Sequence, residues 1–182
     1  MHFYLCVTAV LATALIGIMT IFGIMSRSQK SPKGSLYERL GGVYAIAAVI
    51  DRFSDNLIDN PKVGRASPNP HLARWSTERV DRLPGLKWMR TLWVCDITGG
   101  PQNYVPTKAG STHLGLENAH CPLHITSDEF DEVAKILSET MDTFNVPAKE
   151  KGEVMSAFAA HKKEVIASSA LSVTSCPITR FK

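Results

Sequence analysis

The sequence has little of several features that would mark a special class of protein. Four cysteines in 182 residues are too few and too irregularly spaced for a disulfide-rich secreted domain, so we expect no structural disulfide. Neither sign of charge is in large excess, with 20 Lys and Arg against 17 Asp and Glu, and a net charge of +3 gives no reason to expect a nucleic-acid partner. A hydrophobic fraction of 45% excludes a disordered chain. The composition fits one globular domain with an appendage.

Common catalytic and nucleotide-binding motifs are absent as well. The chain has no GxGxxG fingerprint, no phosphate-binding loop, no HExxH and no GxSxG. The acidic residues that follow Ser127 are interpreted as favourable charges in the first turn of a helix, not as an acid/base pair. No run alternates polar and apolar residues convincingly, so we expect no β-sheet.

Residues 1–26 contain no Asp, Glu, Lys or Arg. A helix over the 23 residues from Phe3 to Met25 would rise about 34 Å, which is enough to cross the hydrocarbon core of a bilayer. We therefore predict a transmembrane anchor over residues 1–26, with a cleaved signal or a buried hydrophobic helix as alternatives. We therefore expect a single-pass membrane protein. Because Lys and Arg are enriched on the cytoplasmic side of membrane spans, the basic residues of the linker 27–34 predict that the C-terminal domain faces the cytoplasm.

The rest of the chain is predicted to form an all-α domain over residues 35–168, followed by a loose polar tail over 169–182. Apolar residues recur at three- and four-residue steps, the pattern of an amphipathic helix. Helices are expected over 36–40, 44–58, 86–98, 127–144 and from Pro147 through Ile166. Residues 60–85 are expected to be mostly loop with room for a short helix over 72–80, and residues 101–113 to be irregular.

One cluster of residues suggests chemistry at a metal. His113, His120, Cys121 and His124 lie within twelve residues, and both imidazole and thiolate bind transition metals. Their spacing leaves three interpretations open: a zinc site, a single axial haem ligand, or histidines that happen to gather in loops. Cys121-Pro122 and Cys176-Pro177 are weak matches to thiolate haem-sensing sites, and Cys95 is expected to be a buried apolar thiol.

Five segments taken together resemble the group I truncated haemoglobins. Each matches a characteristic stretch of that family, in the family's order, and the match covers roughly residues 35–167. The segments are Ser35–Gly42, Ala45–Asn60, Thr98–Pro101 with Tyr104, Ala119-His120 with Ile125 and Phe130-Asp131, and Val146-Pro147.

The resemblance implies a two-over-two helical sandwich that holds haem b, with His120 as the proximal ligand of the iron. A neutral imidazole nitrogen binds iron while its other ring nitrogen is held by a carbonyl or carboxylate. The distal pocket implied by the resemblance comprises Phe53, Ser54, Leu86, Met89, Arg90 and Trp93.

The implied distal pocket departs from the family pattern. Ser54 stands where many relatives carry Tyr, and Arg90 stands where a Gln is often found. Arg90 or Trp88 could donate a hydrogen bond to a bound ligand, and Arg90 could equally reach a haem propionate or solvent. A sixth iron ligand from His71 is a further alternative.

We therefore expect a membrane-tethered haem protein that binds O2, NO or CO. A further expectation is NO dioxygenase activity, for which a reductase would supply electrons. The alternative is an accessory subunit of a larger membrane complex whose globin-like domain holds haem only incidentally or not at all. A third hypothesis is a redox or haem sensor acting through Cys95, Cys121 or Cys176.

Overall fold

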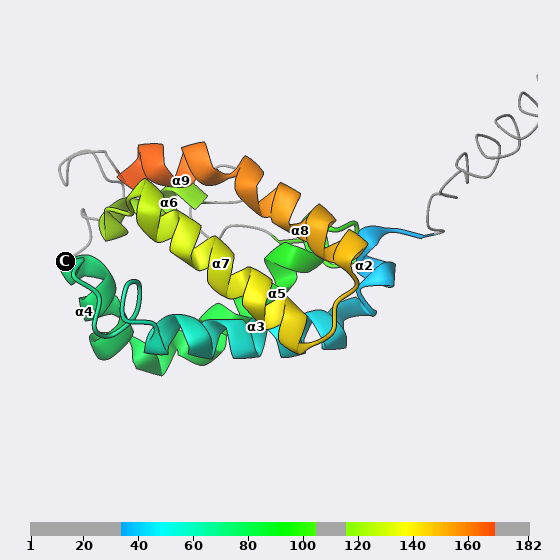
Figure 1. The fold of residues 1–182 in the computed structure, drawn as a ribbon, viewed down its shortest axis with the longest axis horizontal. Coiled ribbons are helices and arrows are strands. Elements are labelled where there is room, and N and C mark those ends of the chain that lie inside the picture. The colour runs from blue at the N-terminus through cyan, green and yellow to red at the C-terminus, as the bar shows by residue number, and fades with distance from the viewer. Residues whose placement is uncertain (1–33, 105–115, 170–182) are drawn as a thin grey trace, which may run out of the picture. The chain divides into compact units, whose positions relative to one another are not determined.

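The computed structural model describes residues 34–104 and 116–169, and within these ranges the only regular secondary structure is helical. This confirms the predicted all-α fold. In chain order the helices are α2 (Leu36–Arg39), α3 (Gly42–Asp59), α4 (Pro70–Glu78), η1 (Val80–Arg82), α5 (Leu83–Ile97), α6 (Leu116–His120), η2 (Cys121–Leu123), α7 (Ser127–Thr143), α8 (Ala148–Ala160) and α9 (Lys162–Ser169) (Figure 1).

Four long helices form two packed pairs. Helix α3 packs against α5, α7 packs against α8, and α3 also contacts α7, so the two pairs are joined through α3 and α7. The short helix α6 packs against α9. This is the two-over-two arrangement that the resemblance implied.

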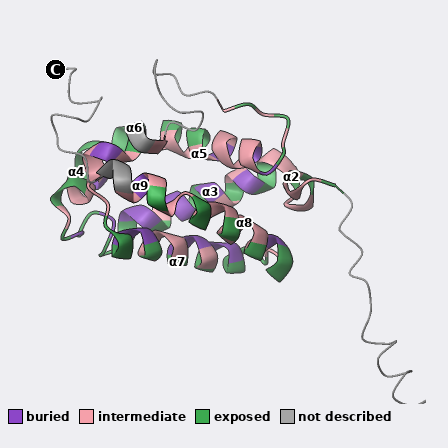
Figure 2. Ribbon diagram, turned by 90° about the horizontal axis from the view of Figure 1, so that it is seen from above, coloured by how far each residue is buried: buried purple, intermediate pink, exposed green. Residues whose placement is uncertain are grey.

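The core lies along the apolar face of α3. Ile46, Ile50, Phe53 and Leu57 recur at three- and four-residue steps and are all buried. They cluster with Cys95 of α5 and with apolar residues of α7. Figure 2 shows buried and exposed residues on different sides of α3 and α7. Cys95 has 0% of its surface exposed, as expected for an apolar thiol.

A capping box starts α7. The Thr126 hydroxyl accepts a hydrogen bond from the backbone N–H of Glu129 (3.2 Å), and the Glu129 carboxylate accepts one from the backbone N–H of Thr126 (2.7 Å). The sequence pattern predicted the cap at Ser127, one residue too late. Thr126 takes the position because Glu129 stands three residues after it, which completes the reciprocal pair.

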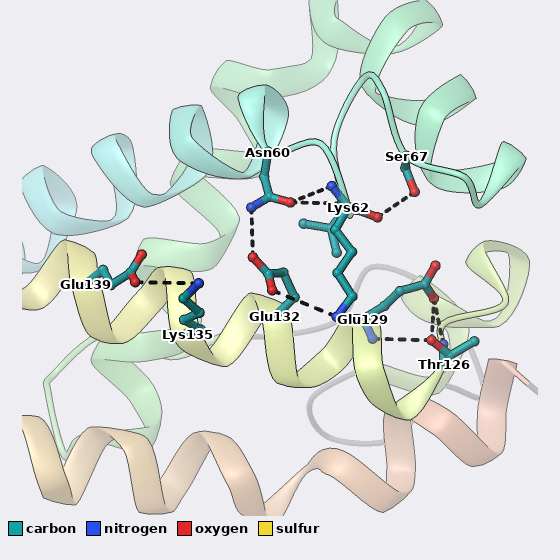
Figure 3. Close-up of polar contacts among 9 residues, drawn as sticks. Asn60, Lys62, Ser67, Thr126, Glu129, Glu132, Lys135 and Glu139 are labelled. Atoms are coloured by element: carbon teal, nitrogen blue, oxygen red, sulfur yellow. Dashed lines mark hydrogen bonds and ion pairs between the residues drawn. The ribbon is translucent and has the colours of Figure 1, made fainter.

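The loop after α3 is tied to α7 (Figure 3). The Asn60 side chain donates to Glu132 on α7 (3.0 Å), and its carbonyl oxygen accepts from the backbone N–H groups of Lys62 (2.8 Å) and Val63 (3.1 Å). Gly64 follows in the same turn, where an added Cβ would lie 2.2 Å from the backbone oxygen of Ile58. The turn therefore needs glycine because the backbone of α3 passes too close for any side chain.

Two salt bridges connect α2 to α8. The Arg39 guanidinium lies 3.6 Å from Glu150 and also pairs with Glu153. The Arg39 and Glu150 side chains are only 13% and 11% exposed, so this charge pair is largely removed from water. Breaking a buried pair by removing one partner is costly because the other charge is left without compensation.

The last predicted helix is interrupted at His161. We expected one helix from Pro147 through Ile166, but α8 ends at Ala160 and α9 begins at Lys162. The backbone N–H of His161 bonds three residues back to Phe158 (3.2 Å), and its ring pairs with Glu164 (Nδ1 to Oε2, 3.1 Å) and packs edge-on against Trp93. These side-chain contacts hold the turn at a position where the sequence carries neither Gly nor Pro.

The predicted membrane localisation is corrected. Across residues 34–104 and 116–169, no helix combines the length and the apolar character needed to cross a bilayer. This finding contradicts the assignment of a single-pass membrane protein with a cytoplasmic domain. Residues 1–26, which carried that prediction, lie outside the described residues, as do most of the segment 101–113 and of the tail 169–182.

Candidate functional site

A cavity of about 520 Å³ lies among α3, α5, α6, α7 and α8. Its walls are mostly apolar, with a few polar side chains, which is the usual make-up of a small-molecule site. The structure brings all seven residues implied by the resemblance to this one cavity. They are Phe53 and Ser54 from α3, Leu86, Met89, Arg90 and Trp93 from α5, and His120 from α6.

His120 is the last residue of α6, and its own helix holds its ring. Nδ1 lies 2.8 Å from the carbonyl oxygen of Leu116, one turn earlier. Burial lowers the pKa of His120, the bond to Leu116 opposes that shift, and the positive charge of Arg90 adds to it. The imidazole is therefore kept neutral at physiological pH, which is the state that binds a metal ion.

Arg90 lies on α5 and is held by α3. Its Nη1 donates to the hydroxyl oxygen of Ser54 (3.0 Å), and its guanidinium carbon stands 5.7 Å from the centroid of the Phe53 ring. Part of its surface stays accessible because it lines the cavity. Burial lowers the pKa of Arg90 to about 10, so the side chain remains a cation at neutral pH.

Other α5 side chains take different positions around the cavity. Met89 lines it but is 47% exposed, so it stands at the edge. Trp88, the alternative donor considered from the sequence, is 55% exposed and does not line the cavity. Trp93 also lines the cavity, and its indole Nε1 is buried without an acceptor among the described residues.

The histidine cluster of the sequence does not come together as a metal site. Among residues 34–104 and 116–169, no group of three or more His, Cys, Asp or Glu side chains could hold a metal ion. The His124 ring lies against the His71 ring at a tilt of 46°, with ring centroids 4.5 Å apart, and neither residue lines the cavity. His113 lies outside the described residues.

Cys121, which follows His120 directly, is fully buried and disulfide-bonded. This contradicts the expectation of a chain without disulfides. Cys95 is a free thiol and is not the partner of Cys121. Irregular cysteine spacing excluded a disulfide-rich class of protein, but it could not exclude a single bond.

The comparison with family models decides the classification. The model for bacterial-like globins matches residues 35–167. This chain belongs to the bacterial-like globin family. A relative of this globin, the group 1 truncated hemoglobin GlbN of Mycolicibacterium paratuberculosis, is 22% identical over 151 residues, which cover 83% of this chain and 98% of the relative.

A solved structure supports the fold of this globin. The 2/2 hemoglobin of Synechococcus sp. PCC 7002, determined in the cyanomet state and with covalently attached heme, matches with a TM-score of 0.56 and 23% identity. The match covers 74% of this chain and 99% of the Synechococcus chain. At this identity the likeness shows the globin fold alone.

The globin family implies haem binding, and the cavity of this globin suits such a group. A haem needs apolar walls, one neutral imidazole and donors for its carboxylates. The cavity supplies the apolar walls and His120, and the buried Trp93 Nε1 is a donor that lacks an acceptor among the described residues.

The sequence pattern missed His161 as a site residue of this globin. His161 lines the cavity from the turn between α8 and α9, and its ring centroid lies 5.4 Å from that of Trp93. It lies inside a segment interpreted as one continuous helix, so only the break in that helix would have singled it out.

Proposed function

We propose that this globin binds haem b in the cavity, with His120 as the proximal ligand of the iron, and that it binds a diatomic gas such as O2, NO or CO on the distal side. The observation that carries the proposal is a neutral, oriented histidine in the wall of an apolar cavity. The family supplies the expectation of haem, and the ligand residue is our assignment.

His120 would hold the iron through Nε2, since Nδ1 is engaged by the Leu116 carbonyl. That hydrogen bond fixes the plane of the ring and raises the basicity of the coordinating nitrogen. The iron supplies the gas-binding chemistry, while the protein sets access and polarity.

The distal wall would exclude water from the bound gas. Phe53 is buried, and Leu86 lines the same side of the cavity from α5. An apolar wall would keep water and protons away from the space in which a gas ligand would bind. Ser54 and Arg90 are the polar groups that interrupt this wall.

Trp93 and His161 would hold the polar edge of the haem. The indole N–H of Trp93 is buried without an acceptor among the described residues, and a carboxylate is a strong acceptor for it. His161 adjoins the Trp93 ring and lines the same cavity.

The test is an optical spectrum of the purified protein after reconstitution with haem, in the ferric, ferrous and CO-bound forms. We expect a Soret band in the wild type, its loss or marked weakening in His120→Gln, and its retention in the matched control His71→Gln, which replaces an exposed histidine outside the cavity. A wild type that takes up no haem, or an unchanged spectrum in His120→Gln, would overturn the proposal.

A further inference from the structure

Arg90 is a cation facing the cavity that has no counter-ion among the described residues. Lys87, one turn earlier on the same helix, is different, since its ammonium group lies 2.7 Å from carboxylate oxygens of both Asp51 and Asp55. A buried cation is normally paired because burying an uncompensated charge is costly. An unpaired guanidinium in a cavity wall therefore indicates that its counter-charge arrives with a ligand.

The guanidinium is held by a fully buried residue. Ser54, whose hydroxyl accepts the bond from Arg90, has 0% of its surface exposed. The same hydroxyl donates to the carbonyl of Ile50 (2.7 Å), so its lone pair is directed toward Arg90. The ring of Phe53 supports the cation from the same helix.

Most of the hydrogen-bonding capacity of Arg90 remains for a ligand. A guanidinium has five N–H donors in a planar fork, and among the described residues one of them is used, toward Ser54. Donors of this kind bind anions more strongly than neutral acceptors, and the apolar surroundings strengthen the attraction. Arg90 and His120 both line the cavity, and the positive charge of Arg90 contributes to the lowered pKa of His120.

We propose that Arg90, positioned by Ser54, makes the distal side of the cavity a binding site for small monovalent anions such as azide and nitrite as ligands of ferric iron. This proposal rests on the proposed function, because it requires an iron that His120 would hold in the cavity. It adds a preference for anionic ligands over neutral ones such as CO.

A haem carboxylate is the other source of negative charge that Arg90 could meet. The position of Arg90 favours a small ligand at the iron, since Ser54 is fully buried whereas haem carboxylates are best solvated near a cavity opening. Trp93 and His161 offer donors for a carboxylate elsewhere in the wall. The experiment separates the two sources.

The experiment measures azide and nitrite affinity of the ferric, haem-reconstituted protein from shifts of the Soret band. Wild type is compared with Arg90→Gln and with Arg82→Gln, which removes an exposed arginine by the same substitution. We expect Arg90→Gln to weaken anion binding roughly ten- to hundredfold, the loss of one or two charged hydrogen bonds, while CO affinity of the ferrous form changes by less than about threefold. Arg82→Gln should leave both affinities unchanged.

The haem dimethyl ester, which lacks free carboxylates, supplies the second arm. If Arg90 serves the anion, Arg90→Gln lowers azide affinity by the same factor with haem and with its ester. If Arg90 serves a haem carboxylate, Arg90→Gln instead weakens retention of haem but not of the ester, and the proposal is overturned. Equal azide affinities in wild type and Arg90→Gln would overturn the anion-site proposal and leave the proposed function standing. A wild type that takes up no haem would overturn both.

Discussion

Two polar residues that line the cavity, His120 and Arg90, are kept in different charge states. Burial and the positive charge of Arg90 lower the pKa of His120. Burial also lowers the pKa of Arg90, but only to about 10, so Arg90 stays charged at neutral pH. Imidazole can respond to burial by giving up its proton near neutral pH, whereas guanidinium cannot. The cavity therefore combines a neutral metal ligand with a fixed cation.

At Trp93 we predict a loss of haem affinity on removal of a single donor. Trp93→Phe keeps an aromatic ring but removes the indole N–H that has no acceptor among the described residues. Haem retention should weaken roughly three- to tenfold, the value of one hydrogen bond of about 1 kcal/mol. Transfer of haem to an excess of apomyoglobin measures this. Retention equal to that of the wild type would mean that Nε1 does not contact the haem.

At Cys95 we predict a thiol that is protected by the fold. Burial raises the pKa of Cys95 above its ordinary value, so the folded state favours the protonated form. This contribution to stability is fully present below the unfolded pKa and is lost as the pH rises through the raised folded pKa. Alkylation by iodoacetamide at pH 8 should be slow in the native protein and fast in denaturant, followed by mass spectrometry of the peptide containing Cys95. Rapid alkylation of the native protein would contradict the burial.

For individual residues, the sequence identified the side chains that line the cavity but not the contacts between them. The side chains that line the cavity were named before the fold was known through the resemblance to the truncated haemoglobins, since helical periodicity alone singled out none of them as site residues. The hydrogen bond between Ser54 and Arg90 could not be predicted from the sequence. The two residues are 36 positions apart on different helices, so the bond depends on how those helices pack.

Individual elements depend on local chemistry that sequence patterns capture unevenly. Helix α3 was predicted nearly to its ends, because its apolar repeat is strong and Asn60-Pro61 stops it. The division of α8 from α9 escaped prediction because His161 is held by contacts to Trp93 and Glu164, which no local pattern reveals. The short helix α6 was not predicted, since the resemblance marked Ala119-His120 only as the proximal segment.

In the loop after α3 we predict that Gly64→Ala destabilises the domain. An alanine Cβ would lie 2.2 Å from the Ile58 oxygen and 2.4 Å from the Leu57 oxygen, so the backbone of the turn must move. The free energy of unfolding should fall by more than about 1 kcal/mol. Urea denaturation followed by circular dichroism measures the change.

The matched control for that substitution is Gly152→Ala. Gly152 lies in α8 and is exposed, and an added Cβ would meet no atom within 4 Å. The free energy of unfolding should therefore rise by roughly 0.5–1 kcal/mol, because alanine is the better helix former. A similar loss at both positions would argue against a specific steric need at Gly64.

The whole domain is built around a space that its own side chains do not fill. A cavity of about 520 Å³ interrupts the core formed by α3, α5 and α7, so contacts that would normally stabilise these helices are missing. A ligand that fills this space replaces the missing contacts. Stability and haem occupancy should therefore be linked.

For the whole molecule we predict that haem raises the melting temperature. A ligand present at a hundred times its Kd stabilises the native state by about 2.7 kcal/mol, which corresponds to a rise of roughly 5–10 °C for a protein of this size. His120→Gln should show a much smaller rise under the same conditions. Differential scanning calorimetry with and without haem provides the measurement, and equal rises in both proteins would speak against His120 as the ligand.

The ion pairs between Arg39 and helix α8 set a limit on how far the domain can be trimmed. A fragment that begins after α2 would retain Glu150, of which only 11% of the side chain is exposed, as a carboxylate without its arginine. Such a fragment would leave this largely buried charge without compensation, so it should be less stable than the whole domain. The four-residue helix at the start of the described chain therefore belongs to the smallest unit that can be produced as a stable protein.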